Sequence, residues 1–331
     1  MNAYIKAIAS YLPERLVDNN SIVDAFPDWS SDKVVTKLGI KQRHIADVNE
    51  FSSDMAVKAA EKLFEKFSIK PDEIDFVILC TQSPDYLLPT TACVIQNRLK
   101  IPTSAGALDF NLGCSGYVYG LSLAKGLIYA GIAKNILFLT AETYSKFLHP
   151  KDKSNISIFG DGATATVVSE EGYAEIMNFS LGSDGSGFEN LIVKSGGVRH
   201  SQRLNDLHFD EKDNPISSDY LYMNGSEIFN FTLENVPILV QNTLFKNDLN
   251  MDNIDYFVFH QANNYLLGFL RKKMKIPQDK FLHYIENVGN TVSSTIPLAL
   301  ENYINDNTLK GNVLLAGFGV GYSWGGTILK F

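Results

Sequence analysis

The apolar positions of this chain follow two different spacings. Short continuous apolar runs predict buried strands, at residues 3–10, 76–80, 107–111, 135–140, 156–159 and 164–169. Segments with apolar residues at every third or fourth position predict helices, at residues 19–26, 53–67, 90–99 and 115–130 and at the start of 30–46. Because strands alternate with helices, the pattern predicts an α/β fold.

The second half of the chain repeats features of the first. Three segments have similar counterparts about 180 residues further along, an offset that chance rarely keeps constant; the pairs begin at Ile74 and Ile254, at Asn111 and Asn287, and at Asn135 and Asn312. We therefore predict two pseudo-symmetric halves, residues 1–170 and 171–331. Equivalent strand ends of the two halves would then face one another, where α/β sheets place their functional sites.

Composition excludes several classes of protein. The chain has 331 residues, of which 45% are hydrophobic, and a net charge of −8, so a general nucleic-acid or anionic-membrane binder is disfavoured. Residues 1–13 carry a lysine inside their apolar run and are typical of a strand, not of a secretory signal. The uncharged segment 311–329 is rich in glycine, which favours two strands over a membrane helix.

The three cysteines form no C-x-x-C pair, so neither a disulfide framework nor a cysteine-rich zinc site is indicated. A reducing cytoplasm is the expected location. Cys80 and Cys93 are expected in the core. Cys114 stands where an apolar run meets a helical pattern, flanked by Gly113 and Gly116. Unpaired N–H groups of a first helical turn would lower the pKa of this thiol and favour the thiolate, although a buried inert cysteine is the alternative.

Two further polar residues stand at predicted strand ends. His260 follows the apolar run 256–259, and Asn290 lies in the counterpart of the Cys114 segment. Alone, the histidine could be structural and the asparagine a turn residue. Together with Cys114 they suit acyl transfer through a thioester, with two neutral donors for a developing oxyanion or enolate.

Seven motifs, in this order and spacing, resemble the thiolase-fold condensing enzymes, specifically β-ketoacyl-acyl-carrier-protein synthase III, along nearly the whole chain. They are Gly39-Ile-Lys-Gln-Arg-His, Asn111-Leu-Gly-Cys-Ser-Gly, Phe159-Gly-Asp-Gly-Ala, Met223-Asn-Gly-Ser-Glu-Ile-Phe, His260-Gln-Ala-Asn, Gly289-Asn-Thr and Gly317-Phe-Gly-Val-Gly-Tyr-Ser-Trp-Gly. The resemblance implies an α/β thiolase-like fold with layers in the order α-β-α-β-α.

The resemblance also implies a two-step reaction. Cys114 would take an acyl group from a coenzyme A or carrier-protein thioester. Malonyl-acyl carrier protein would then lose carbon dioxide while His260 and Asn290 hydrogen-bond its thioester carbonyl. The other implied site residues are an oxyanion hole at Cys114 with Gly319 or Gly321, and a substrate channel lined by Gly225, Phe229, Asn263 and Leu88, with Tyr117 as either a gate or a core residue. No metal and no resident cofactor are implied, and a homodimer is expected.

Recognition positions depart from the family pattern. Lys33 replaces a tryptophan that stacks on the adenine of coenzyme A, Lys153 replaces its arginine partner, and Tyr265 replaces a further arginine. These changes leave open whether the acyl donor is coenzyme A or a carrier protein, and they favour a specialised pathway over primary fatty-acid initiation. Leu88 replaces a phenylalanine that in the family reaches across the dimer to limit the acyl pocket, which predicts a roomier or differently shaped pocket.

The densest basic run, residues 271–275, includes Arg271, Lys272 and Lys273. A solvated helix face is one interpretation. The resemblance implies instead that this run docks the acidic acyl carrier protein, since steering by opposite charge needs only a local patch. A further basic position of the family is Asn230 here.

Three alternatives are weaker. Hydroxymethylglutaryl-coenzyme A synthase needs a glutamate base where this chain has Gln82, a neutral amide. Thiolase uses a second cysteine late in the chain, and none follows Cys114. A non-catalytic acyl-binding or chain-length subunit typically loses the nucleophile, which is present here.

Overall fold

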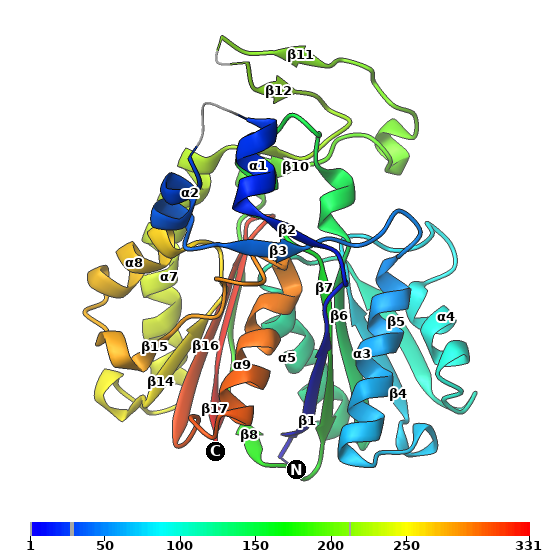
Figure 1. Cartoon of the computed structure of the whole chain (residues 1–331). Helices are drawn as coiled ribbons and strands as arrows, with labels where there is room; N and C mark the ends of the chain where they lie inside the picture. Colours follow the sequence, from blue (N-terminus) through cyan, green and yellow to red (C-terminus); the bar gives the residue numbers. More distant parts are fainter. Residues whose placement is uncertain (1, 27–29, 212) are drawn as a thin grey trace.

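The computed structural model describes residues 2–26, 30–211 and 213–331. Among them, eleven strands form one sheet that runs through the molecule (Figure 1). Its order is β15-β14-β16-β17-β8-β1-β7-β6-β4-β5, with β9 paired to β17. The strands are β1 (Tyr4–Tyr11), β4 (Phe76–Cys80), β5 (Gly106–Phe110), β6 (Asn135–Glu142), β7 (Gly162–Ser169), β8 (Ala174–Ile176), β9 (Ser180–Ser183), β14 (Tyr256–Phe259), β15 (Phe281–Leu282), β16 (Asn312–Gly319) and β17 (Ser323–Lys330).

The described helices are α1 (Asn19–Ala25), α2 (Ser31–Leu38), α3 (Ser52–Phe67), α4 (Thr91–Arg98), α5 (Gly116–Tyr129), α6 (Lys153–Ile156), α7 (Gly225–Lys246), α8 (Asn264–Lys273) and α9 (Thr295–Asn305). Of these, α3, α4, α5, α7, α8 and α9 form three layers against the two halves of the sheet (Figure 1). Short strand pairs lie outside the sheet: β2 (Leu16–Asp18) with β3 (Gln42–His44), β10 (Leu191–Ile192) with β13 (Tyr222–Met223), and β11 (His208–Phe209) with β12 (Pro215–Ile216).

The central layer consists of α5 and α9, whose apolar side chains share one core with strands of both halves. Helices α3 and α4 cover the outer face of the first half, and α7 and α8 cover the outer face of the second. Along β4, Val77 and Leu79 pack in the outer core while Ile78 and Cys80 pack in the central one. A strand buried on both faces explains why these residues form a continuous apolar run.

Both halves repeat the same strand order, β5-β4-β6-β7-β1 and β15-β14-β16-β17-β8. The same type of hydrogen bond joins the starts of two neighbouring strands in each half. Asp75 before β4 accepts from the backbone N–H of Asn135 (2.9 Å), and Asp255 before β14 accepts from that of Asn312 (2.8 Å). We propose that the halves divide near residue 170, between β7 and β8, and the repeated order supports this division.

Most predicted elements are confirmed within two or three residues of the bounds given above, including the strand pair β16 and β17 in segment 311–329. The predicted strand 156–159 is wrong. Asp152 caps a short helix there by accepting from the N–H of Asn155, and only Phe159 makes an isolated bridge, to Asn290. Within the described ranges, no helix combines the length and apolar content needed to span a bilayer.

Close packing of α5 on β6 generates a stability prediction. A Cβ atom at Gly120 would lie 2.0 Å from the ring of Phe138, whereas one at Gly126 on the same helix would meet nothing within 4 Å. We expect Gly120→Ala to lower the free energy of unfolding by roughly 1–3 kcal/mol through overpacking. Gly126→Ala should raise it by up to about 1 kcal/mol through helix propensity. Urea unfolding monitored by circular dichroism measures both, and a shift in the same direction for the two variants contradicts this packing.

Candidate active site

The three residues singled out from the sequence line one cavity. Cys114 follows β5, His260 follows β14, and Asn290 lies between β15 and α9, so all three stand beyond the carboxyl ends of parallel strands. The cavity measures about 480 Å³ and its lining is mostly apolar. One half of the fold therefore supplies the thiol, and the other supplies the imidazole and the amide.

Cys114 is 7% exposed and lies two residues before α5 begins. Burial, with a smaller effect of the nearby Glu142 carboxyl group, raises the pKa of its thiol to about 12. The predicted lowering of this pKa is therefore wrong for the free protein. The N–H groups of Gly116 and Val118 donate to the carbonyls of Gly113 and Ser115, so these first-turn groups are already bonded.

His260 is held from three sides. Its backbone N–H donates to the carbonyl of Ala316 (2.8 Å), its Nδ1 lies 2.7 Å from Thr295 Oγ1, and its ring meets the ring of Phe318 edge-on. Burial lowers the pKa of His260 to about 3. The side chain is therefore a neutral imidazole at neutral pH, with a single ring proton.

Asn290 has a fixed amide orientation. Its backbone N–H donates to Ile158 O (2.9 Å), and its own carbonyl accepts from Gly160 N–H (3.0 Å). Its side-chain oxygen accepts from Val292 N–H (2.9 Å), so the NH₂ group is presented as the donor. Val292 adopts φ of 56°, a left-handed conformation that a β-branched residue rarely takes. Such local strain is common where a loop aims a functional side chain.

The other predicted site residues are only partly brought together. Gly225, Phe229, Asn263 and Gly319 line the same cavity. A Cβ atom at Gly319 would lie 3.0 Å from Cys114 Sγ, so its backbone comes close to the nucleophile. Gly321 does not line this cavity.

Leu88 and Tyr117 lie outside it. Leu88 is 86% exposed, and its neighbour Leu87 lines a second cavity instead. Tyr117 is fully buried, with its ring stacked on Phe138 and its hydroxyl 3.2 Å from that of Thr166. Tyr117 is therefore a core residue in this structure, and the expected contact of residue 88 with the acyl pocket across a dimer stays a prediction.

Sequence reasoning missed three buried residues. Glu142 accepts from Gln82 N–H (3.0 Å) and Ser293 Oγ (2.7 Å), and burial raises its pKa to about 8. Thr295 contacts His260. Tyr144 lines both the first cavity and the second, which measures about 630 Å³. An acid inside an apolar strand was a visible signal for Glu142, whereas nothing in the sequence pattern marked the other two.

The mouth of the cavity is aromatic. Phe229, Tyr265 and Phe269 pack with ring centres 4.8–5.9 Å apart, and Tyr265 is 55% exposed.

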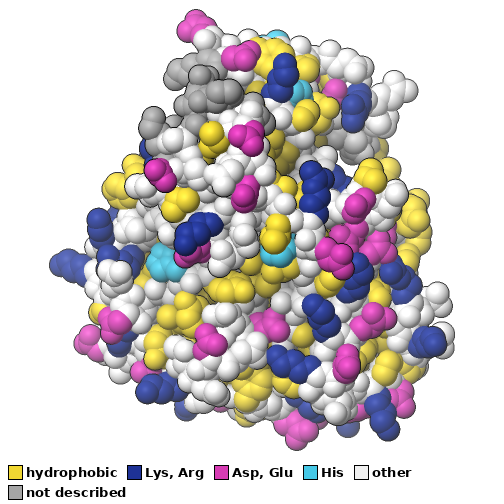
Figure 2. Space-filling model, viewed as in Figure 1, with side chains coloured by type: hydrophobic (Ala, Val, Ile, Leu, Met, Phe, Trp, Pro, Cys, Tyr) yellow, Lys and Arg dark blue, Asp and Glu magenta, His cyan; other side chains and the backbone are white. Residues whose placement is uncertain are grey.

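The basic run begins in the last turn of α8, shortly after Phe269. Lys272 and Lys273 are exposed, whereas Arg271 is half-buried and donates to Ile276 O (3.1 Å). Basic side chains also gather at the left edge of Figure 2, where α8 lies in Figure 1.

Two of the three departures from the family pattern can be placed. Tyr265 lines the cavity mouth, and Lys153 is half-buried at the first position of α6. The side chain of Lys33 lies outside the described residues.

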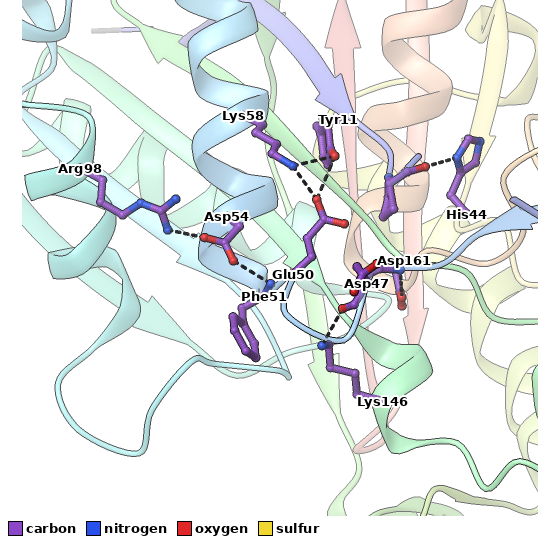
Figure 3. A network of polar contacts seen from close by, with 12 residues as sticks. Tyr11, His44, Asp47, Glu50, Phe51, Asp54, Lys58, Arg98, Lys146 and Asp161 are labelled. Atoms are coloured by element: carbon purple, nitrogen blue, oxygen red, sulfur yellow. Dashed lines mark hydrogen bonds and ion pairs between the residues drawn. The ribbon is translucent and has the colours of Figure 1, made fainter. Parts of the chain in front are cut away.

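A second group of charged residues is structural. Glu50 accepts from Tyr11 Oη (2.8 Å) and Lys58 Nζ (2.7 Å), while Arg98 pairs with Asp54 (2.8 Å) (Figure 3). Beside them, Asp161 accepts from the N–H groups of Ala46 and Ser145, which ties the Phe159-Gly-Asp-Gly-Ala motif to the loop after β3. These charges pair with one another, so we assign them to loop anchoring.

Comparisons with known proteins agree on one family. Two family models match the chain, 3-oxoacyl-[acyl-carrier-protein (ACP)] synthase III over residues 108–185 and the C-terminal part of the same enzyme over residues 244–331. The chain is 36% identical to the β-ketoacyl-[acyl-carrier-protein] synthase III of Clostridium perfringens, over 99% of both chains. It is also 36% identical to the corresponding protein of Clostridioides difficile, over 99% of this chain and 98% of that one.

Solved structures agree with the sequence matches. A crystal structure of a 3-oxoacyl-(acyl-carrier-protein) synthase III is 51% identical, with a TM-score of 0.97 over 100% of both chains. The 3-oxoacyl-(acyl-carrier-protein) synthase of Burkholderia xenovorans is 39% identical, with a TM-score of 0.91 over 99% of this chain and 94% of that one. These matches confirm the predicted α/β thiolase-like fold.

The raised pKa of Cys114 generates a prediction for the free protein. Only the thiolate is alkylated rapidly, so we expect the iodoacetamide rate at Cys114 to rise about tenfold per pH unit from pH 7 to 9.5, without a plateau. Peptide mass spectrometry measures the rate at this site. Cys93, predicted in the core, is in fact exposed on α4 and serves as the internal control for reagent access. A plateau below pH 8 at Cys114 would contradict the raised pKa.

Proposed function

Because this chain belongs to the 3-oxoacyl-[acyl-carrier-protein] synthase III family, we propose that its cavity performs the condensation of a Cys114-bound acyl group with malonyl-acyl carrier protein. The product is a 3-oxoacyl-acyl carrier protein, as in fatty-acid biosynthesis. The observation that carries this proposal is the convergence of Cys114, His260 and Asn290 on one buried cavity.

In the first step, Cys114 Sγ attacks the carbonyl carbon of an acyl thioester. The bond from that carbon to the donor sulfur breaks, and the donor leaves as a free thiol that carries the proton of the Cys114 thiol. The backbone N–H groups of Cys114 and Gly319 are our proposed donors to the oxyanion, since both residues line the cavity beside the sulfur.

In the second step, malonyl-acyl carrier protein loses carbon dioxide, and the electron pair of the broken bond forms an enolate. The enolate carbon attacks the acyl carbon on Cys114, and the cysteine leaves as a thiolate that is then protonated from solvent. His260 and the Asn290 NH₂ group would donate to the enolate oxygen. Donors fixed in a water-poor cavity are worth more there than in water, because they need no reorientation.

The alternatives find less support in the cavity. Gln82 donates to Asn111 Oδ1 (3.2 Å), and its oxygen lies 3.3 Å from the Tyr144 hydroxyl, so it acts as a neutral amide at the edge of the second cavity. A side chain of this kind does not supply the glutamate base of hydroxymethylglutaryl-coenzyme A synthase. A non-catalytic subunit would have no need for the complete donor set around Cys114.

We assign carrier-protein docking to the exposed Lys272 and Lys273, with a lesser part for Arg271, which is already bonded within its own helix end. The aromatic mouth at Tyr265 lacks the planar cation of the family pattern, which favours a carrier protein or an unusual thioester as acyl donor. Pantetheine would pass Gly225, Phe229 and Asn263.

We also propose a homodimer in the cytoplasm. Strand β5 pairs only with β4 among the described residues, and the nearby loop exposes Tyr86, Leu87 and Leu88. An open strand edge beside exposed apolar side chains is typical of a surface that a second copy covers. The three cysteines are free thiols, in keeping with a reducing compartment.

Acyl loading tests the nucleophile. After incubation with a panel of acyl-coenzyme A and acyl-carrier-protein thioesters, we expect the wild-type chain to gain one acyl mass and Cys114→Ala to gain none. Intact-protein mass spectrometry measures the adduct, and the donor that loads fastest identifies the starter. Cys93→Ala is the matched control and should load like the wild type. A folded wild type that takes no acyl group from any thioester would sink the proposal.

Charge reversal tests docking. We expect Lys272→Glu combined with Lys273→Glu to raise KM for malonyl-acyl carrier protein on the order of tenfold at low salt. Loading of Cys114 from the fastest thioester that carries no protein should be unchanged. High salt should shrink the difference, because exposed charges are screened. Lys310→Glu combined with Lys330→Glu, an equal charge change at two exposed lysines outside α8, is the control. Equal KM values for the α8 variant and this control would rule out docking at α8.

A further inference from the structure

The hydroxyl of Thr295 is the hydrogen-bond partner of His260 Nδ1, at 2.7 Å. Both side chains are buried, with exposed fractions of 2% each, so water does not compete for this contact. A neutral imidazole carries one proton, on Nδ1 or on Nε2, and the bond made by one nitrogen decides the state of the other. A hydroxyl can donate or accept, so the direction of this single bond sets the tautomer of His260.

The surroundings of Thr295 favour one direction. The carbonyl oxygen of Val292, which also accepts the backbone N–H of Thr295, lies 3.1 Å from Thr295 Oγ1 and is the competing acceptor for the hydroxyl proton. This distance is longer than the roughly 2.5–3.0 Å usual for an O–H donor, so the competing bond is the weaker one. The distance of 2.7 Å to His260 Nδ1 is also short for an N–H donor and ordinary for an O–H donor. Both observations direct the hydroxyl proton to Nδ1.

We propose that Thr295 is a positioning residue for the condensation step: its hydroxyl donates to His260 Nδ1 and so keeps the ring proton on Nε2. The proposal rests on the proposed function, because in that function the Nε2 proton is donated to the enolate oxygen. With Nδ1 bonded to α9, Nε2 is the nitrogen left for the cavity that His260 lines. An Nε2–H donates to the enolate oxygen beside the Asn290 amide, whereas the opposite tautomer would place a lone pair against it.

The contact is held in place by both elements that it joins. His260 is fixed by its backbone bond to Ala316 and by the edge of the Phe318 ring. Thr295 is the first residue of α9, directly after the short turn that begins at Val292. The same turn thus orients both donors, since Val292 N–H holds the Asn290 oxygen while Thr295 holds the imidazole.

Two variants separate the hydroxyl from its volume. Thr295→Ser keeps the hydroxyl, and Thr295→Val keeps the branched shape without it. The tautomer of His260 is read from ¹⁵N chemical shifts of histidine-labelled protein, with His260→Gln used to assign the signals. We expect Nε2–H in the wild type and in Thr295→Ser. In Thr295→Val the buried Nδ1 has lost its hydrogen-bond donor. We therefore expect the ¹⁵N shifts of His260 no longer to report the Nε2–H tautomer alone.

Kinetics give the second readout. We expect Thr295→Val to slow condensation on the order of 10–100-fold, less than the ~10²–10³-fold that removal of an oxyanion donor causes. Its acyl loading on Cys114 should change by less than about threefold, because only the second step uses the Nε2 proton. Thr295→Ser should keep both rates near wild type.

Each outcome decides the matter. Nδ1–H in the wild type, or condensation by folded Thr295→Val at the wild-type rate, overturns the proposal. If Thr295→Val does not fold, as judged by circular dichroism, the wild-type and Thr295→Ser tautomers decide alone. If the wild type neither loads nor condenses, the proposed function fails, but the nitrogen shifts of the free protein still show whether Thr295 sets the tautomer.

Discussion

The site depends on a backbone contact between the two halves of the fold. The end of β16 approaches the turn at Cys114 so closely that a Cβ atom at Gly317 would lie 2.8 Å from the Cys114 carbonyl, and one at Gly319 would lie 2.9 Å from Cys114 Cβ. Real side chains do not tolerate such distances, so glycine is required at both positions. The hydroxyls of Ser115 and Ser323, 2.7 Å apart, join the same two segments. This approach brings a nucleophile from one half within reach of donors from the other, and either half alone holds only part of the chemistry.

The same burial that assembles the site also neutralises it. Removal from water raises the pKa values of Cys114 and Glu142 and lowers that of His260, so each group prefers its uncharged form. A neutral thiol is protected from alkylation and oxidation while no substrate is present. A neutral imidazole and an amide are suitable donors to an enolate, because they stabilise developing charge without carrying a charge that must itself be solvated. Burial therefore has two consequences. The resting thiol is less reactive than a thiolate, and the hydrogen bonds from the two neutral donors are stronger in the dry cavity.

The sequence predicted the features that follow from the pattern of apolar residues and from the repeat. It missed the features that depend on which residues become neighbours in the folded chain. Strands such as β4 were visible because burial on both faces leaves no polar position, and the repeat revealed Asn290 as the counterpart of Cys114. Segment 156–159 has the same apolar look, but the cap at Asp152 turns it into a helix end. The direction of the Cys114 pKa shift was wrong because the sequence does not show how deeply the thiol is buried, and burial is the main cause of the raised pKa. Thr295 was invisible because its role comes from a side chain 35 residues away.

The departures from the family pattern can be understood from where they lie. Cys114, His260 and Asn290 are buried, so a change at any of them alters packing inside the molecule. Tyr265, in contrast, is exposed at the mouth, where it packs against Phe269, one turn further along α8, and against Phe229 of α7. A substitution there alters which surface approaches the cavity without moving any group inside it. Recognition can thus change on the outer helices while the chemistry inside the cavity stays the same. One chain can therefore combine the unchanged residues Cys114, His260 and Asn290 with a substitution at Tyr265.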